Sequence, residues 1–297
     1  MESHESTKKK KRGDLIVVAS AKGGVGKTLL AVNLAAALCK KNMMVSLVDG
    51  DFQFGDISLS LDLHTTFTLK DIVEDKTLDS QSVLSYLNRH ESGIRVLAAP
   101  DRPEYADLIV PDVITDVLTY LTDHHQFTIV DTGVGFHENN LNMFELADQI
   151  LCMTNLEMST LKNTKLMLET FDMLGLAHKV TLVINRATME SVIKPTDVTD
   201  ILGIDDPIYI PNDFQTSTQS LNIGVPFVTN QPKTEIAKAY FKMAERLYSK
   251  TDMSLAFKKE GFREKFNQKQ EQTEEEPTKK GSSGKSWLHP FGRRGNA

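Results

Sequence analysis

Apolar runs and helical apolar periodicity alternate along the chain from about residue 14 to about residue 249. Short stretches rich in β-branched residues predict strands at residues 15–18, 44–49, 94–99, 127–131, 149–154, 180–185 and just before 210. Apolar positions three and four residues apart predict helices at residues 29–38, 69–73, 83–87, 112–123, 159–174 and 235–248. Because strands that alternate with helices form mostly parallel sheets, we expect an α/β fold with three layers and helices on both faces of the sheet.

The two ends of the chain differ in composition from this central region. Residues 1–13 include five consecutive cations at 8–12, residues 251–284 are charged and glutamine-rich, and residues 285–297 combine the single tryptophan, Trp287, with basic side chains. We therefore expect a basic disordered tail at 1–13, one domain at 14–250, a helical or charged linker at 251–284, and an aromatic-basic tail at 285–297. Two interpretations of the tails stay open: solvated ends, or segments that contact an anionic membrane or a partner.

Charge and cysteine content exclude several classes of protein. The net charge of −6 argues against a globally basic DNA-binding protein. Cys39 and Cys152 do not form a C-x-x-C pair, so zinc and iron–sulfur sites are not expected. No apolar stretch reaches the roughly 18 residues of a spanning helix, and the amino terminus lacks a signal-peptide core. We expect a cytoplasmic protein, peripheral at the inner face of the cell membrane if the tails bind lipid. The adjacent His124 and His125 are expected at the surface.

A glycine-rich segment, Lys-Gly-Gly-Val-Gly-Lys-Thr at residues 22–28, follows the first predicted strand and precedes the first predicted helix. This is the context of a phosphate-binding loop, in which successive backbone N–H groups surround a phosphate at the positive end of a helix. The residues expected to wrap the phosphates are Gly23, Gly24, Val25 and Gly26. Lys27 would reach the β- and γ-phosphates, and the Thr28 hydroxyl would ligate Mg²⁺.

Carboxylates follow two of the predicted strands. Asp49 ends one strand and is followed by Asp51, and Asp131 ends the strand at residues 127–131. The carboxyl ends of parallel strands meet at one edge of a sheet, where carboxylates can hold Mg²⁺ or position a water that attacks a phosphate. A turn or a helix cap is the alternative interpretation of Asp49 and Asp51. Asp131 fits a Walker B carboxylate, which holds Mg²⁺ through water.

The segment at residues 22–28 resembles the deviant Walker A motif of the MinD/ParA family of ATPases. The resemblance implies that ATP and Mg²⁺ bind here and that ATP drives formation of a homodimer. It also implies that Lys22 reaches across that dimer to the ATP of the partner subunit, as an arginine finger would. By the same resemblance, Asp51 orients the hydrolytic water and Asp49 supports the metal shell.

The base of the nucleotide is assigned by resemblance as well. Asn185 ends a predicted strand and is followed by Arg186, and the family pattern implies that this asparagine hydrogen-bonds adenine. On its own, an asparagine at a strand end is also a common turn former. Pro211, Asn212 and Asp213 resemble the loop that wraps the base.

Within the family, residues 51–56, 95–100, 210–213 and 222–226 resemble the CpaE/TadZ branch, which positions Flp or tight-adherence pilus machinery. This implies a slow, partner-stimulated ATPase with pilus or secretion proteins as partners. A MinD-like regulator of flagellar number is the second candidate, because its Walker B strand also runs into Asp-Thr-Gly, here at residues 131–133. A ParA-type DNA-partition protein is the third, and net acidity disfavours it. A scaffold that binds ATP without hydrolysing it is also open.

Overall fold

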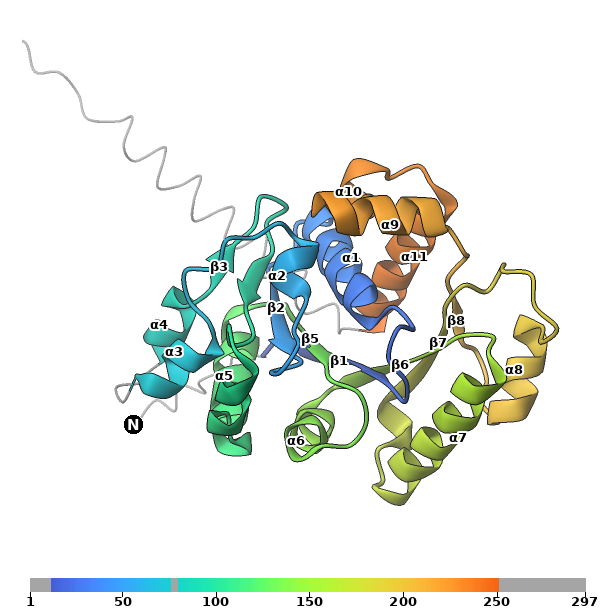
Figure 1. The fold of residues 1–297 in the computed structure, drawn as a ribbon, viewed down its shortest axis with the longest axis horizontal. Helices are drawn as coiled ribbons and strands as arrows, with labels where there is room; N and C mark the ends of the chain where they lie inside the picture. The colour runs from blue at the N-terminus through green and yellow to red at the C-terminus, as the bar shows by residue number, and fades with distance from the viewer. Residues whose placement is uncertain (1–11, 76–79, 251–297) are drawn as a thin grey trace, which may run out of the picture. The chain divides into compact units, whose positions relative to one another are not determined.

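The computed structural model describes residues 12–75 and 80–250. Within these ranges eight strands form one sheet in the order β3-β4-β2-β5-β1-β6-β7-β8 (Figure 1). Neighbouring strands are parallel except β3 and β4, which pair antiparallel at the edge. The strands are β1 (Asp14–Ser20), β2 (Val45–Gly50), β3 (Asn88–Arg89), β4 (Arg95–Leu97), β5 (Phe127–Thr132), β6 (Gln149–Thr154), β7 (Val180–Ile184) and β8 (Ile208–Tyr209). The expected mostly parallel sheet is confirmed.

Helices cover both faces of the sheet, so the three-layer α/β fold is confirmed as well (Figure 1). The α-helices are α1 (Lys27–Lys40), α2 (Ile57–Ser60), α3 (Leu69–Glu74), α4 (Ser80–Ser85), α5 (Pro111–His124), α6 (Glu138–Leu146), α7 (Met158–Met173), α8 (Pro195–Leu202), α9 (Phe214–Ile223), α10 (Phe227–Asn230) and α11 (Glu235–Lys250). Two 3₁₀ helices, η1 (Pro103–Leu108) and η2 (Ala177–Lys179), complete the described elements.

Strand β1 packs against an apolar layer on each face of the sheet. Its side chains alternate, so Ile16 and Val18 join the core under α1, α10 and α11, whereas Leu15 and Val17 join the core under α5, α6 and α7. A strand buried on both faces must read as a continuous apolar run, as β1 does. Small side chains of α1, among them Ala31 and Ala35, let this helix pack closely on the sheet. The glycine loop between β1 and α1 is therefore attached to two rigid elements.

The expectation of a surface position is wrong for His125. The residue follows the last turn of α5 with an extended backbone, which turns its ring inward, and its Nδ1 lies 3.0 Å from the carbonyl oxygen of Leu121. Burial, aided by the nearby charges of Arg95 and His124, lowers the pKa of His125 to about 4. His125 is therefore neutral in the folded protein near pH 7.

This burial predicts a pH dependence of stability. Because the folded pKa is about 4 and the ordinary value is about 6.5, the unfolded chain takes up the proton first. This contribution is complete above pH 6.5 and is lost as the pH falls toward 4, by about 2 kcal/mol at pH 5. Urea denaturation between pH 7.5 and 5 should show a smaller loss for His125→Asn than for wild type. The matched variant His124→Asn should follow wild type; an unchanged slope for His125→Asn would contradict the assignment.

The structure also places the two thiols and bears on membrane insertion. Cys152 is buried and Cys39 is partly buried, both are free, and burial raises the pKa of each thiol to about 12. Both therefore pack as small protonated side chains.

Within residues 12–75 and 80–250, none of the helices has the length and apolarity needed to span a bilayer. The tails predicted at 1–13 and beyond 250 lie almost entirely outside the described residues.

Candidate functional site

The glycine loop joins the end of β1 to the start of α1. Gly26 precedes the first residue of α1 in a left-handed conformation, with φ of 100° and ψ of 29°, and Gly24 has φ of 74°. A Cβ atom on Gly26 would lie 2.8 Å from Nδ2 of Asn185, so this position needs glycine for space as well as for its backbone angles. The first amide groups of a helix have no partner within the helix, so those of α1 are available to an anion, and their contact with phosphate stays a prediction.

Asn185, at the end of β7, contacts this loop directly. Its Nδ2 donates to the carbonyl oxygen of Val25 at 2.8 Å, and its Oδ1 accepts from the backbone N–H of Arg186 at 2.9 Å. The side chain is 8% exposed and lines the neighbouring cavity. Asn185 therefore holds the phosphate loop against the sheet, and its predicted contact with adenine stays a prediction.

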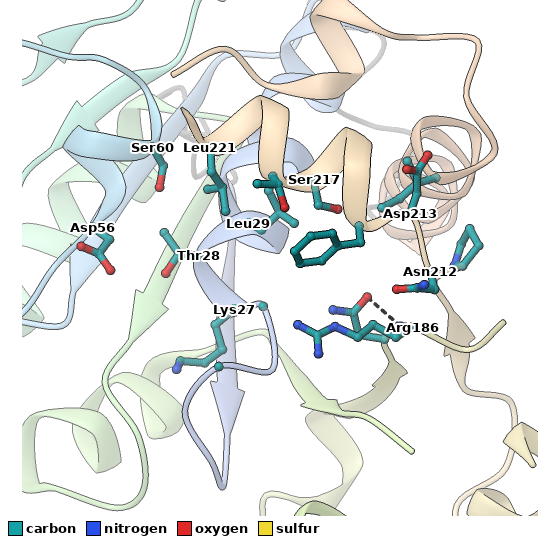
Figure 2. Close-up of a pocket in the computed structure, with 17 residues that line it drawn as sticks. Lys27, Thr28, Leu29, Asp56, Ser60, Arg186, Asn212, Asp213, Ser217 and Leu221 are labelled. Atoms are coloured by element: carbon teal, nitrogen blue, oxygen red, sulfur yellow. Dashed lines mark hydrogen bonds between the residues drawn. The ribbon is translucent and has the colours of Figure 1, made fainter. Parts of the chain in front are cut away.

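A cavity of about 340 Å³ extends from the glycine loop to the start of α9 (Figure 2). Lys27 and Thr28 lie at one side of it, and Arg186 and Asn212 lie at the other (Figure 2). The structure thus brings together most of the predicted phosphate and base residues. The full lining consists of Gly24, Gly26, Lys27, Thr28, Leu29, Asp56, Ser60, Asn185, Arg186, Pro211, Asn212, Asp213, Phe214, Ser217, Thr218, Leu221 and Ile236.

Asp49 and Asp131 lie opposite each other on the paired strands β2 and β5. The Asp49 carboxylate accepts hydrogen bonds from the backbone N–H of Asp51 at 3.3 Å and of Ile57 at 3.1 Å. Burial and the charge of Asp131 raise the pKa of Asp49 well above its usual range. Both oxygens of Asp49 therefore fix the segment at residues 51–57, and its role in a metal shell stays a prediction.

Asp131 has the features of a metal-supporting carboxylate. It is 2% exposed, and burial raises its pKa to about 6, while the Thr28 hydroxyl and the charge of Lys27 favour the ionised form. Its Oδ1 is buried and has no hydrogen-bond partner among the described residues. Buried polar atoms are normally paired, so an oxygen of this kind beside a hydroxyl fits a hydrated Mg²⁺.

The described residues contain no group of three or more His, Cys, Asp or Glu side chains that could hold a metal ion alone. Mg²⁺ usually takes one or two protein ligands and completes its shell with water and phosphate oxygens. Thr28 as a direct ligand and Asp131 through a water molecule would match that small ligand set, and both roles stay predictions. In the bound state the ion would neutralise charge on the phosphates.

Asp51 and the loop after β5 border a second cavity of about 460 Å³. A Cβ atom on Gly133 would lie 3.8 Å from Cγ of Asp51, so the two loops are neighbours. Asn140 of α6 donates from Nδ2 to the carbonyl oxygens of Gly133 at 3.3 Å and Gly135 at 2.9 Å. This places Asp51 beside the loop that follows Asp131, and its predicted role in orienting the hydrolytic water stays a prediction.

Asp56 is a cavity residue that the sequence reasoning missed as a site. It is the residue before α2 and lines the first cavity, facing the side on which Thr28 lies (Figure 2). Its charge is one of the factors that raise the pKa of Asp131. In the sequence, Asp56 stands directly before the apolar Ile57, a position typical of a helix N-cap, and this pattern could have pointed to it.

Lys22 does not line either cavity. Its Nζ lies 3.2 Å from Oε2 of Glu157 and 2.9 Å from Oγ of Ser159, at the start of α7. The side chain is 41% exposed, and exposed ion pairs of this kind contribute at most about 1 kcal/mol. Lys22 can therefore exchange this ion pair for another partner at little cost. Its predicted contact with the ATP of a partner subunit stays a prediction.

The parallel sheet, the glycine loop at a helix start and the strand-end carboxylates define an α/β protein of the P-loop class. A family profile described as the CobQ/CobB/MinD/ParA nucleotide binding domain matches residues 16–223. The chain belongs to this nucleotide-binding family.

Individual relatives agree with this assignment. The chain is 29% identical over 241 residues to the septum site-determining protein MinD of Synechocystis, covering 78% of this chain and 88% of that protein. Its fold matches MinD of Pyrococcus horikoshii complexed with Mg-ADP, with a TM-score of 0.69, 26% identity, and coverage of 79% and 96%. It also matches a ParA family ATPase from Chlorobium tepidum, with a TM-score of 0.72, 23% identity, and coverage of 78% and 98%.

Proposed function

We propose that the protein is an ATP-dependent dimerising switch that hydrolyses ATP slowly. The observation that carries the proposal is the buried Oδ1 of Asp131, which has no hydrogen-bond partner among the described residues and lies beside the Thr28 hydroxyl. Thr28 ends the phosphate loop and lines the first cavity. A P-loop site with a metal-supporting carboxylate suits a nucleoside triphosphate with Mg²⁺. The structural likeness to a protein complexed with Mg-ADP supports the same ligand class.

Each residue has a defined task in this proposal. The glycine-loop amides and Lys27 bind the phosphates, Thr28 and Asp131 hold the Mg²⁺ shell, and Asp51 positions the attacking water. Lys22 leaves Glu157 and enters the site of a second subunit, which makes each site complete only in the dimer. Hydrolysis then releases the loop at residues 51–57 and the dimer separates. Turnover is slow in the absence of a stimulating partner, because catalysis waits for assembly.

The proposed cellular role is the placement or assembly of a cell-surface machine, and the CpaE/TadZ-like segments at residues 51–56 and 210–213 support it. In this role a Flp or tight-adherence pilus component is the partner. The likeness to MinD proteins supports a second candidate, a MinD-like regulator of placement or number of flagella. Both roles use the same nucleotide switch.

Molar mass tests the switch. Light scattering of wild type with ATP and Mg²⁺ should give twice the mass found with ADP, because the triphosphate holds the dimer together. Lys22→Ala should stay monomeric with ATP while it still binds nucleotide, since Lys22 lines neither cavity. The matched variant Lys238→Ala, which loses a similar surface ion pair with Glu235, should dimerise as wild type does.

The same measurement can overturn the proposal. If the wild-type protein binds ATP but stays monomeric at every concentration, it is a nucleotide-binding adaptor and not a dimerising switch. A Lys22→Ala variant that dimerises fully would remove the role of Lys22 across the dimer.

A further inference from the structure

The first cavity has two chemically different ends. The end formed by Lys27 and Thr28 is cationic and polar, and it suits phosphates. The end formed by Pro211, Asn212 and Phe214 lies at the start of α9 and contains an aromatic ring. This end must receive the part of the nucleotide farthest from the phosphates, if the proposed function is right.

Phe214 is unusually exposed for a residue at the wall of a cavity. It is the first residue of α9 and is 72% exposed. The helix start is fixed by Asp213, whose Oδ1 accepts a hydrogen bond from the backbone N–H of Thr216 at 3.0 Å. Asp213 thereby holds the backbone of Phe214 in place while the ring stays uncovered. A fixed and uncovered aromatic ring offers a flat apolar surface at low entropic cost.

Arg186 borders the same end of the cavity from the loop after β7 (Figure 2). Its backbone is held in a left-handed conformation, with φ of 54°, which non-glycine residues adopt rarely. Its N–H is fixed by Oδ1 of Asn185, the side chain that also holds the phosphate loop. Within residues 12–75 and 80–250, no hydrogen bond or ion pair holds its guanidinium. A guanidinium plane, like an aromatic ring, stacks on a flat π system.

We propose that Phe214 is a stacking platform for the purine base of the bound nucleotide, with the Arg186 guanidinium supporting the same base. The inference deepens the proposed function and rests on it. A purine supplies a flat π surface on which both side chains can stack, and this stacking does not depend on a hydrogen-bond pattern. Because the two fused rings of a purine offer a larger face than the single ring of a pyrimidine, Phe214 adds more affinity for purine than for pyrimidine nucleotides.

Calorimetric titration of the full chain with Mg-ADP, Mg-UDP and Mg-pyrophosphate tests this role. Phe214→Ala should weaken ADP binding about tenfold, and Phe214→Tyr should retain it. The preference for ADP over UDP should fall, while pyrophosphate, which has no base, should bind Phe214→Ala as it binds wild type. The matched control is Phe67→Ala, because Phe67 is a 40% exposed phenylalanine that lines neither cavity.

A spectroscopic readout separates stacking from a structural effect. In Phe214→Trp, saturating ADP should quench fluorescence well beyond the change in wild type, whose single tryptophan is Trp287. Pyrophosphate should not produce this quench. If Phe214→Ala binds ADP within twofold of wild type while Lys27→Ala loses ADP, the platform is wrong and the nucleotide site stands. If wild type binds neither ADP nor pyrophosphate, the proposed function itself fails.

Discussion

Replacement of Asp51 by alanine is expected to lower ATP turnover by about 100-fold and to trap the protein as the ATP-bound dimer. Asp51 lies beside Gly133, in the loop that Asp49 holds through the N–H groups of Asp51 and Ile57. Its side chain accepts a hydrogen bond from the N–H of Phe54 at 3.2 Å, so the carboxylate is oriented by its own loop. Loss of the carboxylate removes the group that positions water, but it leaves Lys27, Thr28 and Asp131 to bind ATP.

The two effects are measured separately, by single-turnover hydrolysis of ATP and by light scattering with ATP and Mg²⁺. Asp107→Ala is the matched control, because Asp107 is an exposed carboxylate that lines the same second cavity from η1. It should hydrolyse ATP at the wild-type rate. A rate for Asp51→Ala within threefold of wild type, with unchanged mass, would favour a scaffold that binds ATP without using hydrolysis.

The phosphate loop and the parallel sheet could be predicted because both are local patterns. A strand, three glycines and a helix stand in one short segment, and strands buried on both faces read as apolar runs. The carboxylates Asp49 and Asp131 were recognisable since parallel strands carry their carboxyl ends to one edge. The position of a residue relative to the end of a strand therefore predicts most of the candidate site.

Helix α9 could not be predicted from periodicity, because its buried positions are polar. Its buried residues are Thr216 and Ser220, so it presents no apolar face in the sequence. Phe214 is the first residue of this helix, so the sequence pattern does not single it out either. His125 was misjudged for a different reason: adjacent residues point apart on a helix, but His125 lies just beyond α5 with an extended backbone. Chain direction after a helix end is set by tertiary packing, which the local sequence does not record.

The other large effect is expected at Gly224, where alanine should destabilise the fold by about 3 kcal/mol. Gly224 ends α9 in a left-handed conformation with φ of 66°, and its N–H bonds to the carbonyl oxygen of Ser220. A Cβ atom here would collide with the Cβ and backbone of Asp62, which follows α2 and itself has φ of 45°. Neither partner can move easily, because each backbone is already in a constrained turn.

Gly203 provides the matched control for this collision. It ends α8 with φ of 65°, and a Cβ atom there would meet nothing within 4 Å. Gly203→Ala should therefore cost only the left-handed strain, about 1 kcal/mol, seen as a fall in Tm of about 3 °C against about 10 °C for Gly224→Ala. Equal shifts for the two variants would show that α2 and α9 are not in firm contact.

The contact at Gly224 also connects the two ends of the candidate site. Helix α2 begins at Ile57, which Asp49 holds, and α9 begins after Asp213, at the base end of the cavity. Gly224 lies where the far ends of these helices meet, so a shift there displaces Phe214 and Asp56 relative to each other. Gly224→Ala should weaken Mg-ADP binding in calorimetry under conditions where the variant is folded, whereas Gly203→Ala should not. Wild-type affinity in folded Gly224→Ala would mean that the two helices support the nucleotide independently.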